Sequence, residues 1–245
     1  MIKLGKLSLD GRPKVVLVVS DKESTQAIQS AHPDALEIRV DHFRKLNSQY
    51  LEDNLKKRVQ TRLPLILTIR NQAVEGGILL RRRKISDQLK WDLFKIGMKY
   101  VQAVDIELTS PLLKSVIGLA KKKVVIVSSH HFKNTPTLAG LEKILREGKK
   151  SGGDIIKIAA HAKNRDDLNR LLEFTIKHKK DKIITLAMGR LGSISRLVFP
   201  SVGSLLTYSF LGKPFAPGQI PLKTLQKHFR LYYDGSCDPS SRGTK

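Results

Sequence analysis

The chain alternates short apolar runs with longer amphipathic segments along almost its whole length. Eight of the apolar runs have the length of a strand, and they cover residues 15–20, 35–40, 63–69, 103–108, 124–129, 154–159, 183–188 and 205–210. Helical patterns lie between them, among them residues 22–29, 91–100, 138–149, 165–177 and 222–232. Eight rounds of strand and helix in 245 residues predict an α/β fold, the (β/α)8 TIM barrel.

An open doubly wound sheet would show a similar alternation. Such sheets often begin with a glycine-rich dinucleotide fingerprint, and no such motif occurs early in this chain, which favours the barrel. No linker separates a second domain. We therefore expect one catalytic domain over residues 1–233, followed by a polar tail over residues 234–245.

Composition excludes several classes of protein. The longest apolar runs fall far short of the roughly 20 residues of a membrane span, and no signal-peptide pattern opens the chain, so we expect a cytoplasmic protein without membrane contact. The single cysteine, Cys237, lies in the polar tail. One cysteine supports neither a disulfide framework nor a cysteine metal site, and we expect no metal.

The formal net charge of +23 is unusually high and raises nucleic acid as a possible partner. The basic residues form clusters at segment ends, at residues 56–58, 81–84, 121–123 and 177–182. No RNA-recognition or zinc-finger signature accompanies them. We therefore favour a solvated basic surface over a nucleic-acid face, and such a surface would also attract a small anionic substrate.

Lys157 lies in the middle of an apolar strand that follows Gly152 and Gly153. A run of this kind is typical of a strand buried on both faces of a parallel sheet. Burying an ammonium group without a partner costs on the order of several kcal/mol, because the charge loses its hydration. Two interpretations remain open, a structural ion pair or an amine used as a nucleophile, for example in Schiff-base formation.

Polar residues collect where the predicted strands end, which is the active-site end of a (β/α)8 barrel. Because residues two apart on a strand face the same way, alternating charges predict a polar barrel interior. The residues concerned are Glu37, Arg39, Asp41, Arg70, Asp105, Glu107, Ser128, His130, Lys157 and, after the seventh strand, Arg196. An internal ion-pair network or a structural histidine would produce part of the same pattern.

Eight motifs together resemble the type I 3-dehydroquinate dehydratase family, in the order in which that family has them and over nearly the whole chain. They are Glu37-Ile38-Arg39-Val40-Asp41, Arg70 with Glu75-Gly76-Gly77, Asp105-Ile106-Glu107, Ser129-His130 with Phe132 and Thr135-Pro136, Lys157, Ser195-Arg196, Gly203-Ser204, and Ala216-Pro217-Gly218-Gln219. The resemblance implies a homodimeric barrel that dehydrates 3-dehydroquinate to 3-dehydroshikimate in aromatic amino-acid biosynthesis. It also implies that no metal or added cofactor takes part.

The resemblance implies a role for each matching residue. Lys157 would form an imine with the substrate ketone, His130 would act as general base and acid, and Glu75 would orient His130. Arg196 would bind the substrate carboxylate through two parallel hydrogen bonds. The remaining substrate contacts would come from Glu37, Arg39, Arg70, Phe215 and Gln219. Residues 212–219 are then a candidate lid.

The chain departs from the family pattern at three positions. Phe215 stands where many members have serine, Glu75 follows Arg70 at one residue more than the commonest spacing, and His131 stands where aspartate is frequent. Strand alternation places His130, and not His131, on the face of Ser128. Two other hypotheses remain, a different Schiff-base barrel lyase such as an aldolase, and a catalytically inactive basic barrel that binds nucleic acid.

Overall fold

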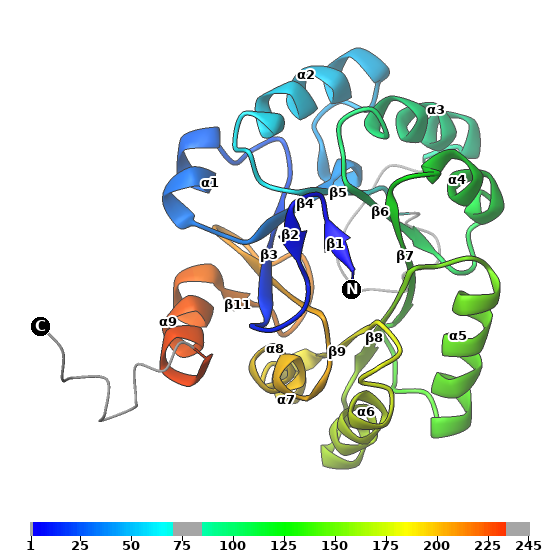
Figure 1. Ribbon diagram of the computed structural model, residues 1–245, viewed down its shortest axis with the longest axis vertical. Coiled ribbons are helices and arrows are strands. Elements are labelled where there is room, and N and C mark those ends of the chain that lie inside the picture. Colours follow the sequence, from blue (N-terminus) through cyan, green and yellow to red (C-terminus); the bar gives the residue numbers. More distant parts are fainter. Residues whose placement is uncertain (1, 71–84, 234–245) are drawn as a thin grey trace, which may run out of the picture.

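Eight parallel strands form a ring with helices around it (Figure 1) in the computed structural model, which describes residues 2–70 and 85–233. The ring strands are β3 (Lys14–Val19), β4 (Ala35–Arg39), β5 (Leu65–Thr68), β6 (Ala103–Glu107), β7 (Val124–His131), β8 (Ile155–His161), β9 (Ile183–Met188) and β10 (Leu206–Phe210). They pair in the order β10-β3-β4-β5-β6-β7-β8-β9. The Leu205 N–H donates to the Ile183 carbonyl at 2.9 Å and so links the last two strands. The predicted (β/α)8 barrel is confirmed, with all eight strands in place.

The helices lie outside the ring (Figure 1). They are α1 (Thr25–Ala31), α2 (Ser48–Val59), α3 (Asp87–Gly97), α4 (Leu113–Ala120), α5 (Leu138–Lys150), α6 (Arg165–Lys177), α7 (Gly189–Gly192), α8 (Ser195–Val198) and α9 (Leu222–Tyr233), with 3-10 turns η1 (Val40–His42) and η2 (Phe199–Val202). No helix in the described ranges is long and apolar enough to cross a membrane.

Two helices begin elsewhere than the apolar periodicity predicts. The start expected at Lys22 lies at Thr25, and the start expected at Trp91 lies at Asp87. In both cases a serine caps the first turn, because the Ser24 side chain accepts from the Ala27 N–H and the Ser86 side chain accepts from the Leu89 N–H. The predicted starts were wrong because the capping serines, and not the apolar periodicity, mark where these helices begin.

Two short elements complete the fold. The antiparallel pair β1 (Lys3–Leu4) and β2 (Leu7–Ser8) lies across one end of the ring in Figure 1. Leu4 and Leu9 from this segment are buried in the apolar cluster inside the barrel, so the hairpin covers the end where the strands begin. At the other end, β11 (Ile220–Pro221) pairs with the end of β10.

The barrel interior changes from apolar to polar along the strands. Near the strand starts it is filled by a layer of buried apolar side chains from Val16, Ala35, Ile66, Ala103, Ile126 and Ile155. Two residues further along the same strands, the inward positions are Val18, Glu37, Thr68, Asp105, Ser128 and Lys157, and these are buried as well. The apolar layer fills the barrel at the end where the strands begin, and the second layer forms the bottom of a polar site at the other end.

Candidate active site

Lys157 is only 4% exposed. Its Nζ atom lies 3.0 Å from Asp105 Oδ2 and 3.3 Å from Glu37 Oε1. The Nζ atom also lies 3.9 Å from the centroid of the Tyr208 ring, a cation–π contact. The amine is thus an ion-paired group inside the barrel, as one of the two sequence interpretations predicts.

Asp105 connects this amine to the rest of the site. Its Oδ2 atom lies 2.8 Å from Arg70 Nη2, and its Oδ1 atom accepts from Ser128 Oγ at 2.6 Å. Burial alone would raise the pKa of Asp105, but the charges of Arg70 and Lys157 lower it below its ordinary value. Asp105 is therefore a carboxylate between two cations.

The network continues outward from Arg70. Arg70 Nη1 donates to Ser128 Oγ at 2.6 Å and lies 4.0 Å from Glu107 Oε1. Glu107 Oε2 in turn lies 3.1 Å from the Nζ atom of Lys90, which comes from α3 and is 1% exposed. A continuous set of buried charges thus joins a helix outside the barrel to the amine within it.

His130 lies two residues beyond Ser128 on β7, on the same face of the strand. Its Nδ1 atom is buried and has no hydrogen-bond partner among the described residues. Burial, followed by the positive charges of Arg70 and Lys157, lowers the pKa of His130 well below its ordinary value. The ring is therefore neutral at pH 7, as a general base must be.

His131 faces the other way, as strand alternation predicts. Its Nε2 atom lies within 2.9 Å of Ser129 Oγ, and Ser129 is on the opposite face from Ser128. Burial alone lowers the pKa of His131, and none of the charges that act on His130 contributes. Of the two histidines, His130 is the one in the electrostatic field of the site.

Arg196 is 2% exposed at the start of α8 (Ser195–Val198). Its Nε atom is buried and has no hydrogen-bond partner within the described parts of the chain. Burial lowers the pKa of the guanidinium to about 10, although Tyr208 and Glu37 act in the opposite direction. The group is still charged at pH 7, and a buried cation with an unused donor suits an anionic ligand.

The loop between β10 and β11 carries Phe215 and Gln219. Gln219 Oε1 accepts from the backbone N–H groups of Phe215 at 2.6 Å and Ala216 at 3.1 Å. The Phe215 ring meets the His42 ring edge-on, with the centroids 4.9 Å apart. Phe215 also packs against the apolar cluster of the barrel interior. These contacts place the candidate lid beside the turn that follows β4.

The predicted site residues do not all take part in one network. Lys157, Glu37 and Arg70 are joined through Asp105, whereas Arg39 pairs with its neighbour Asp41 through Nε–Oδ1 at 3.0 Å and Nη2–Oδ2 at 2.8 Å. Glu75 lies outside the described residues. No group of three or more metal-ligating side chains is arranged to hold a metal ion in the described ranges.

Some residues of the site were not among those assigned a role from the sequence. These are Asp105, Ser128, Thr68, Tyr208 and Lys90. Thr68 donates to Glu37 Oε1 at 2.9 Å. The first four are inward positions of strands, so the two-residue period indicates them. Lys90 has a weaker signal, since it lies on the buried stripe of α3 with Leu93, Phe94 and Gly97.

Comparison with known proteins agrees with this geometry. A family model described as Type I 3-dehydroquinase matches residues 15–236. The 3-dehydroquinate dehydratase of Thermodesulfovibrio yellowstonii is 35% identical over 229 residues, which cover 91% of this chain and 97% of the relative. That of Methanococcoides burtonii is 34% identical over 238 residues, covering 94% and 99%.

Solved structures show the same relationship. The crystal structure of type I 3-dehydroquinate dehydratase from Clostridium difficile with covalently modified comenic acid has a TM-score of 0.81 and 31% identity, covering 92% of this chain and 94% of that one. The enzyme from Aquifex aeolicus gives a TM-score of 0.77 and 32% identity, covering 90% and 99%. The chain belongs to the type I 3-dehydroquinase family.

Proposed function

We propose that this protein is a 3-dehydroquinate dehydratase that removes water from 3-dehydroquinate through an imine on Lys157 to give 3-dehydroshikimate. The observation that carries the proposal is the position of Lys157, a buried amine that contacts two carboxylates at the polar end of the barrel. Family membership supports the reaction, and with it a place in the shikimate pathway toward aromatic amino acids.

The two carboxylates suit an imine intermediate. The amine attacks the ketone as a free base, and water leaves as the imine forms. A protonated imine keeps a positive charge at the position of Nζ, beside Glu37 and Asp105. The same carboxylates therefore stabilise the resting ammonium and the iminium, so the charged network need not rearrange during the reaction.

His130 is the proposed general base and acid. The iminium acidifies the adjacent carbon, and a neutral His130 accepts a proton from it. The imidazolium then donates a proton to the hydroxyl that leaves from the next carbon, so one side chain serves both steps of a syn elimination. Hydrolysis of the product imine restores Lys157. We further propose that Glu75 orients this ring.

Substrate recognition follows from the charges. We assign the substrate carboxylate to Arg196, whose buried Nε has no hydrogen-bond partner among the described residues. Glu37, Arg39, Arg70 and Gln219 would contact the substrate hydroxyls, and Phe215 would shape the pocket with an apolar ring. Residues 212–219 would cover the bound substrate as a lid.

Three broader expectations stay predictions. They are a homodimer, a cytoplasmic location, and a division into a barrel over residues 1–233 and a tail over residues 234–245. The resemblance to the family supports the homodimer, and the short apolar runs of the sequence support the cytoplasmic location. Light scattering of the purified protein, cell fractionation, and limited proteolysis would test them in turn.

Turnover tests the proposed function. The purified protein, mixed with 3-dehydroquinate, is expected to produce the increase in absorbance that accompanies formation of the conjugated enone 3-dehydroshikimate. Lys157→Ala is expected to show none of this increase. Equal rates in both proteins would contradict the mechanism. Activity on aldol substrates without activity on 3-dehydroquinate would instead support a different Schiff-base lyase.

A further inference from the structure

Eight lysines gather on three neighbouring turns at the end of the barrel where the strands begin. This lysine patch consists of Lys121, Lys122 and Lys123 before β7, Lys149 and Lys150 before β8, and Lys179, Lys180 and Lys182 before β9. The turns are adjacent because the Asp154 N–H donates to the Val125 carbonyl at 2.9 Å and the Ile156 N–H donates to the Lys182 carbonyl at 3.2 Å. Neighbouring strands lie about 5 Å apart, so the charges are concentrated in a small area.

The acidic residues of these turns leave most of the patch uncompensated. Asp154 accepts from the Val125 N–H at 2.8 Å, and Asp181 is paired with Lys149 at 2.5 Å and with His178 at 2.6 Å. The side chains of the other seven patch lysines make no hydrogen bond or ion pair with any described residue. All of the eight lysines are exposed except Lys123, which is partly exposed.

The patch includes a surface groove, and two of its lysines have positive φ angles. A surface groove between the second and third turns is lined by Lys149, Lys180 and Lys182, together with Gly153, Asp154, Ile156 and Asp181. Lys121 and Lys182 have φ values of +32° and +54°, in the left-handed region that favours glycine. Lysine thus occupies two turn positions at which glycine would be less strained.

The chemistry of the patch fits phosphate groups in a row. Lysine is a compact point charge that binds phosphate, and such a contact does not depend on the identity of the base. The three turns contain no Phe, Tyr or Trp side chain on which an unpaired base would stack, and none of the exposed large hydrophobic side chains of the described residues lies in them. These features favour the backbone of a duplex over a single strand or a membrane surface.

The sequence alone favours a solvated basic surface, but the fold gathers these lysines on three adjacent turns. We therefore propose that the lysine patch binds the phosphate backbone of double-stranded nucleic acid, without sequence preference. The patch lies at the start of the strands, whereas Lys157 and His130 face the opposite end of the barrel. A bound duplex would therefore leave the active-site mouth open. The inference is independent of the proposed dehydratase activity.

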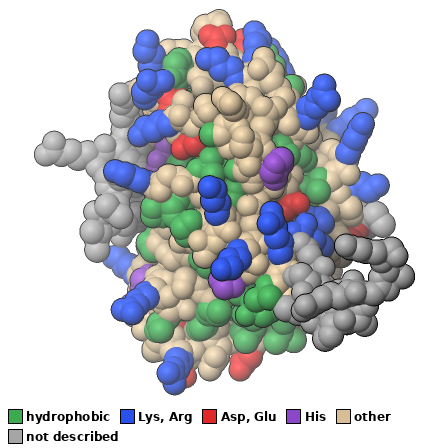
Figure 2. Space-filling view, turned by 90° about the vertical axis from the view of Figure 1, so that its left-hand side faces the viewer, with side chains coloured by type: hydrophobic (Ala, Val, Ile, Leu, Met, Phe, Trp, Pro, Cys, Tyr) green, Lys and Arg blue, Asp and Glu red, His purple; other side chains and the backbone are tan. Residues whose placement is uncertain are grey.

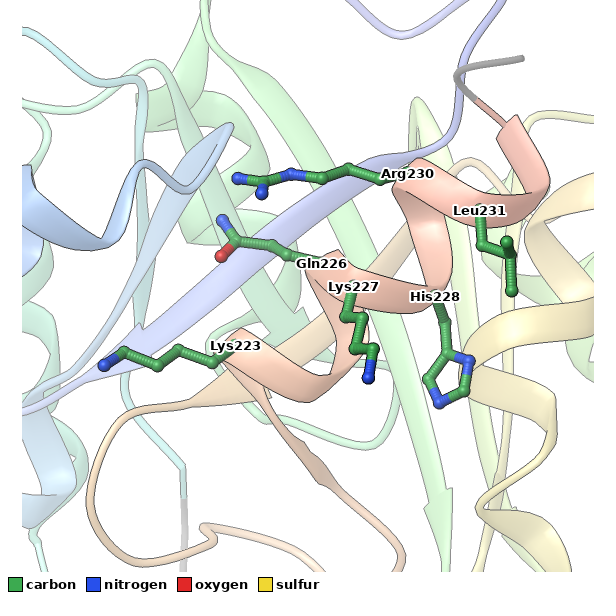
Figure 3. Close-up of a pocket in the computed structure, with 6 residues that line it drawn as sticks. All are labelled: Lys223, Gln226, Lys227, His228, Arg230 and Leu231. Carbon is green, nitrogen blue, oxygen red and sulfur yellow. The ribbon is translucent and has the colours of Figure 1, made fainter. Parts of the chain in front are cut away.

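The rest of the surface supplies a control. Lys and Arg side chains are spread over the side of the molecule that carries α1 and α9, where acidic side chains are fewer (Figure 2). A groove on α9 is lined by Lys223, Gln226, Lys227, His228, Arg230 and Leu231 (Figure 3). Gln226 binds the Ala31 and His32 carbonyls at the end of α1. This groove contains three positive charges outside the patch.

The test measures binding of a fluorescein-labelled 20-base-pair DNA duplex by anisotropy over a series of salt concentrations. We compare the wild type with Lys122→Gln/Lys150→Gln/Lys180→Gln, which removes one charge from each turn, and with Lys223→Gln/Lys227→Gln/Arg230→Gln, which removes the same charge from α9. The patch variant is expected to have a less steep salt dependence, with the negative slope of log K against log salt smaller in magnitude by about 3, and to bind at least about tenfold more weakly at 0.1 M salt. The α9 variant should keep most of the affinity.

Other outcomes would overturn the proposal. Equal losses in the two variants would mean that net charge, not the patch, attracts the duplex. Absence of wild-type binding at 0.1 M salt would reject the site. Binding to vesicles containing phosphatidylserine, without binding to the duplex, would assign the patch to a membrane surface. Circular dichroism of both variants checks that each is folded.

Discussion

The Oδ2 atom of Asp105 is shared by two cations, Lys157 Nζ at 3.0 Å and Arg70 Nη2 at 2.8 Å. With Glu37, Glu107 and Lys90, these residues form a buried set of three carboxylates and three basic groups. The three negative and three positive charges of the set cancel before substrate arrives. Arg196 does not belong to this set, so its positive charge is the one suited to the negative charge of the substrate.

Arg196→Met should separate binding from stability. Loss of the guanidinium is expected to lower kcat/KM at least about 100-fold, equivalent to about 3 kcal/mol, mostly through KM. Because the variant also removes a buried charge, its melting temperature should stay level or rise. Arg190→Met, a change of the exposed arginine of α7, serves as the control. An unchanged KM in Arg196→Met would contradict the assignment.

The pH profile reports on His130. Because burial and the charges of Arg70 and Lys157 lower the pKa of His130 below the ordinary 6.5, the base is active down to pH values below 6.5. We expect kcat/KM to rise with pH through an apparent pKa below 6.5 and then to level off. His130→Ala should abolish most activity. His131→Ala should leave the rise of kcat/KM on the acid side of the profile at the same pH as in the wild type. A rise of kcat/KM through an apparent pKa above 6.5 would refute this account.

Lys90 should contribute to stability through Glu107. Lys90→Met leaves the buried Glu107 without its 3.1 Å partner, so the free energy of unfolding should fall by about 3 kcal/mol or more. Urea denaturation measures the change, and the surface variant Lys95→Met on the same helix provides the comparison. The double variant Lys90→Met/Glu107→Gln should recover part of the loss. If the double variant is no more stable than Lys90→Met, the pair is not the cause.

Gly218 should be required for the loop that carries Phe215 and Gln219. Its φ is +79°, and a Cβ atom there would lie 2.6 Å from the Gly189 carbonyl oxygen, so Gly218→Ala must displace the loop. We expect kcat/KM to fall about tenfold or more, since the lid residues lose their positions. Gly212→Ala is the matched control, because a Cβ atom at that position meets nothing within 4 Å. Similar kinetics in both variants would argue against a lid.

The strands and the polar layer could be predicted from the sequence because both follow a period. Apolar runs of strand length marked all eight strands, and the two-residue alternation placed Glu37, Asp105 and Lys157 inside the barrel. The helix starts were less predictable, since they depend on single capping serines. The family motifs then pointed to the reaction, which the fold alone does not determine.

The pairing of the charges could not be predicted. Arg39 and Arg70 both face the mouth, yet Arg39 pairs with Asp41 because the η1 turn brings that carboxylate back toward it. The partner of Lys90 lies on β6, and no spacing within α3 indicates a contact with Glu107. Such contacts depend on how side chains from separate elements meet, which only the folded structure specifies.

The central claim is that Lys157 forms the imine, and chemical trapping tests it most directly. The protein is incubated with 3-dehydroquinate and sodium borohydride, which reduces an imine to a stable amine, and the modified peptide is located by mass spectrometry. We predict one substrate-derived adduct on Lys157 and loss of activity in proportion to labelling. Active protein that gives no adduct, or an adduct on another lysine such as Lys90, would contradict the account.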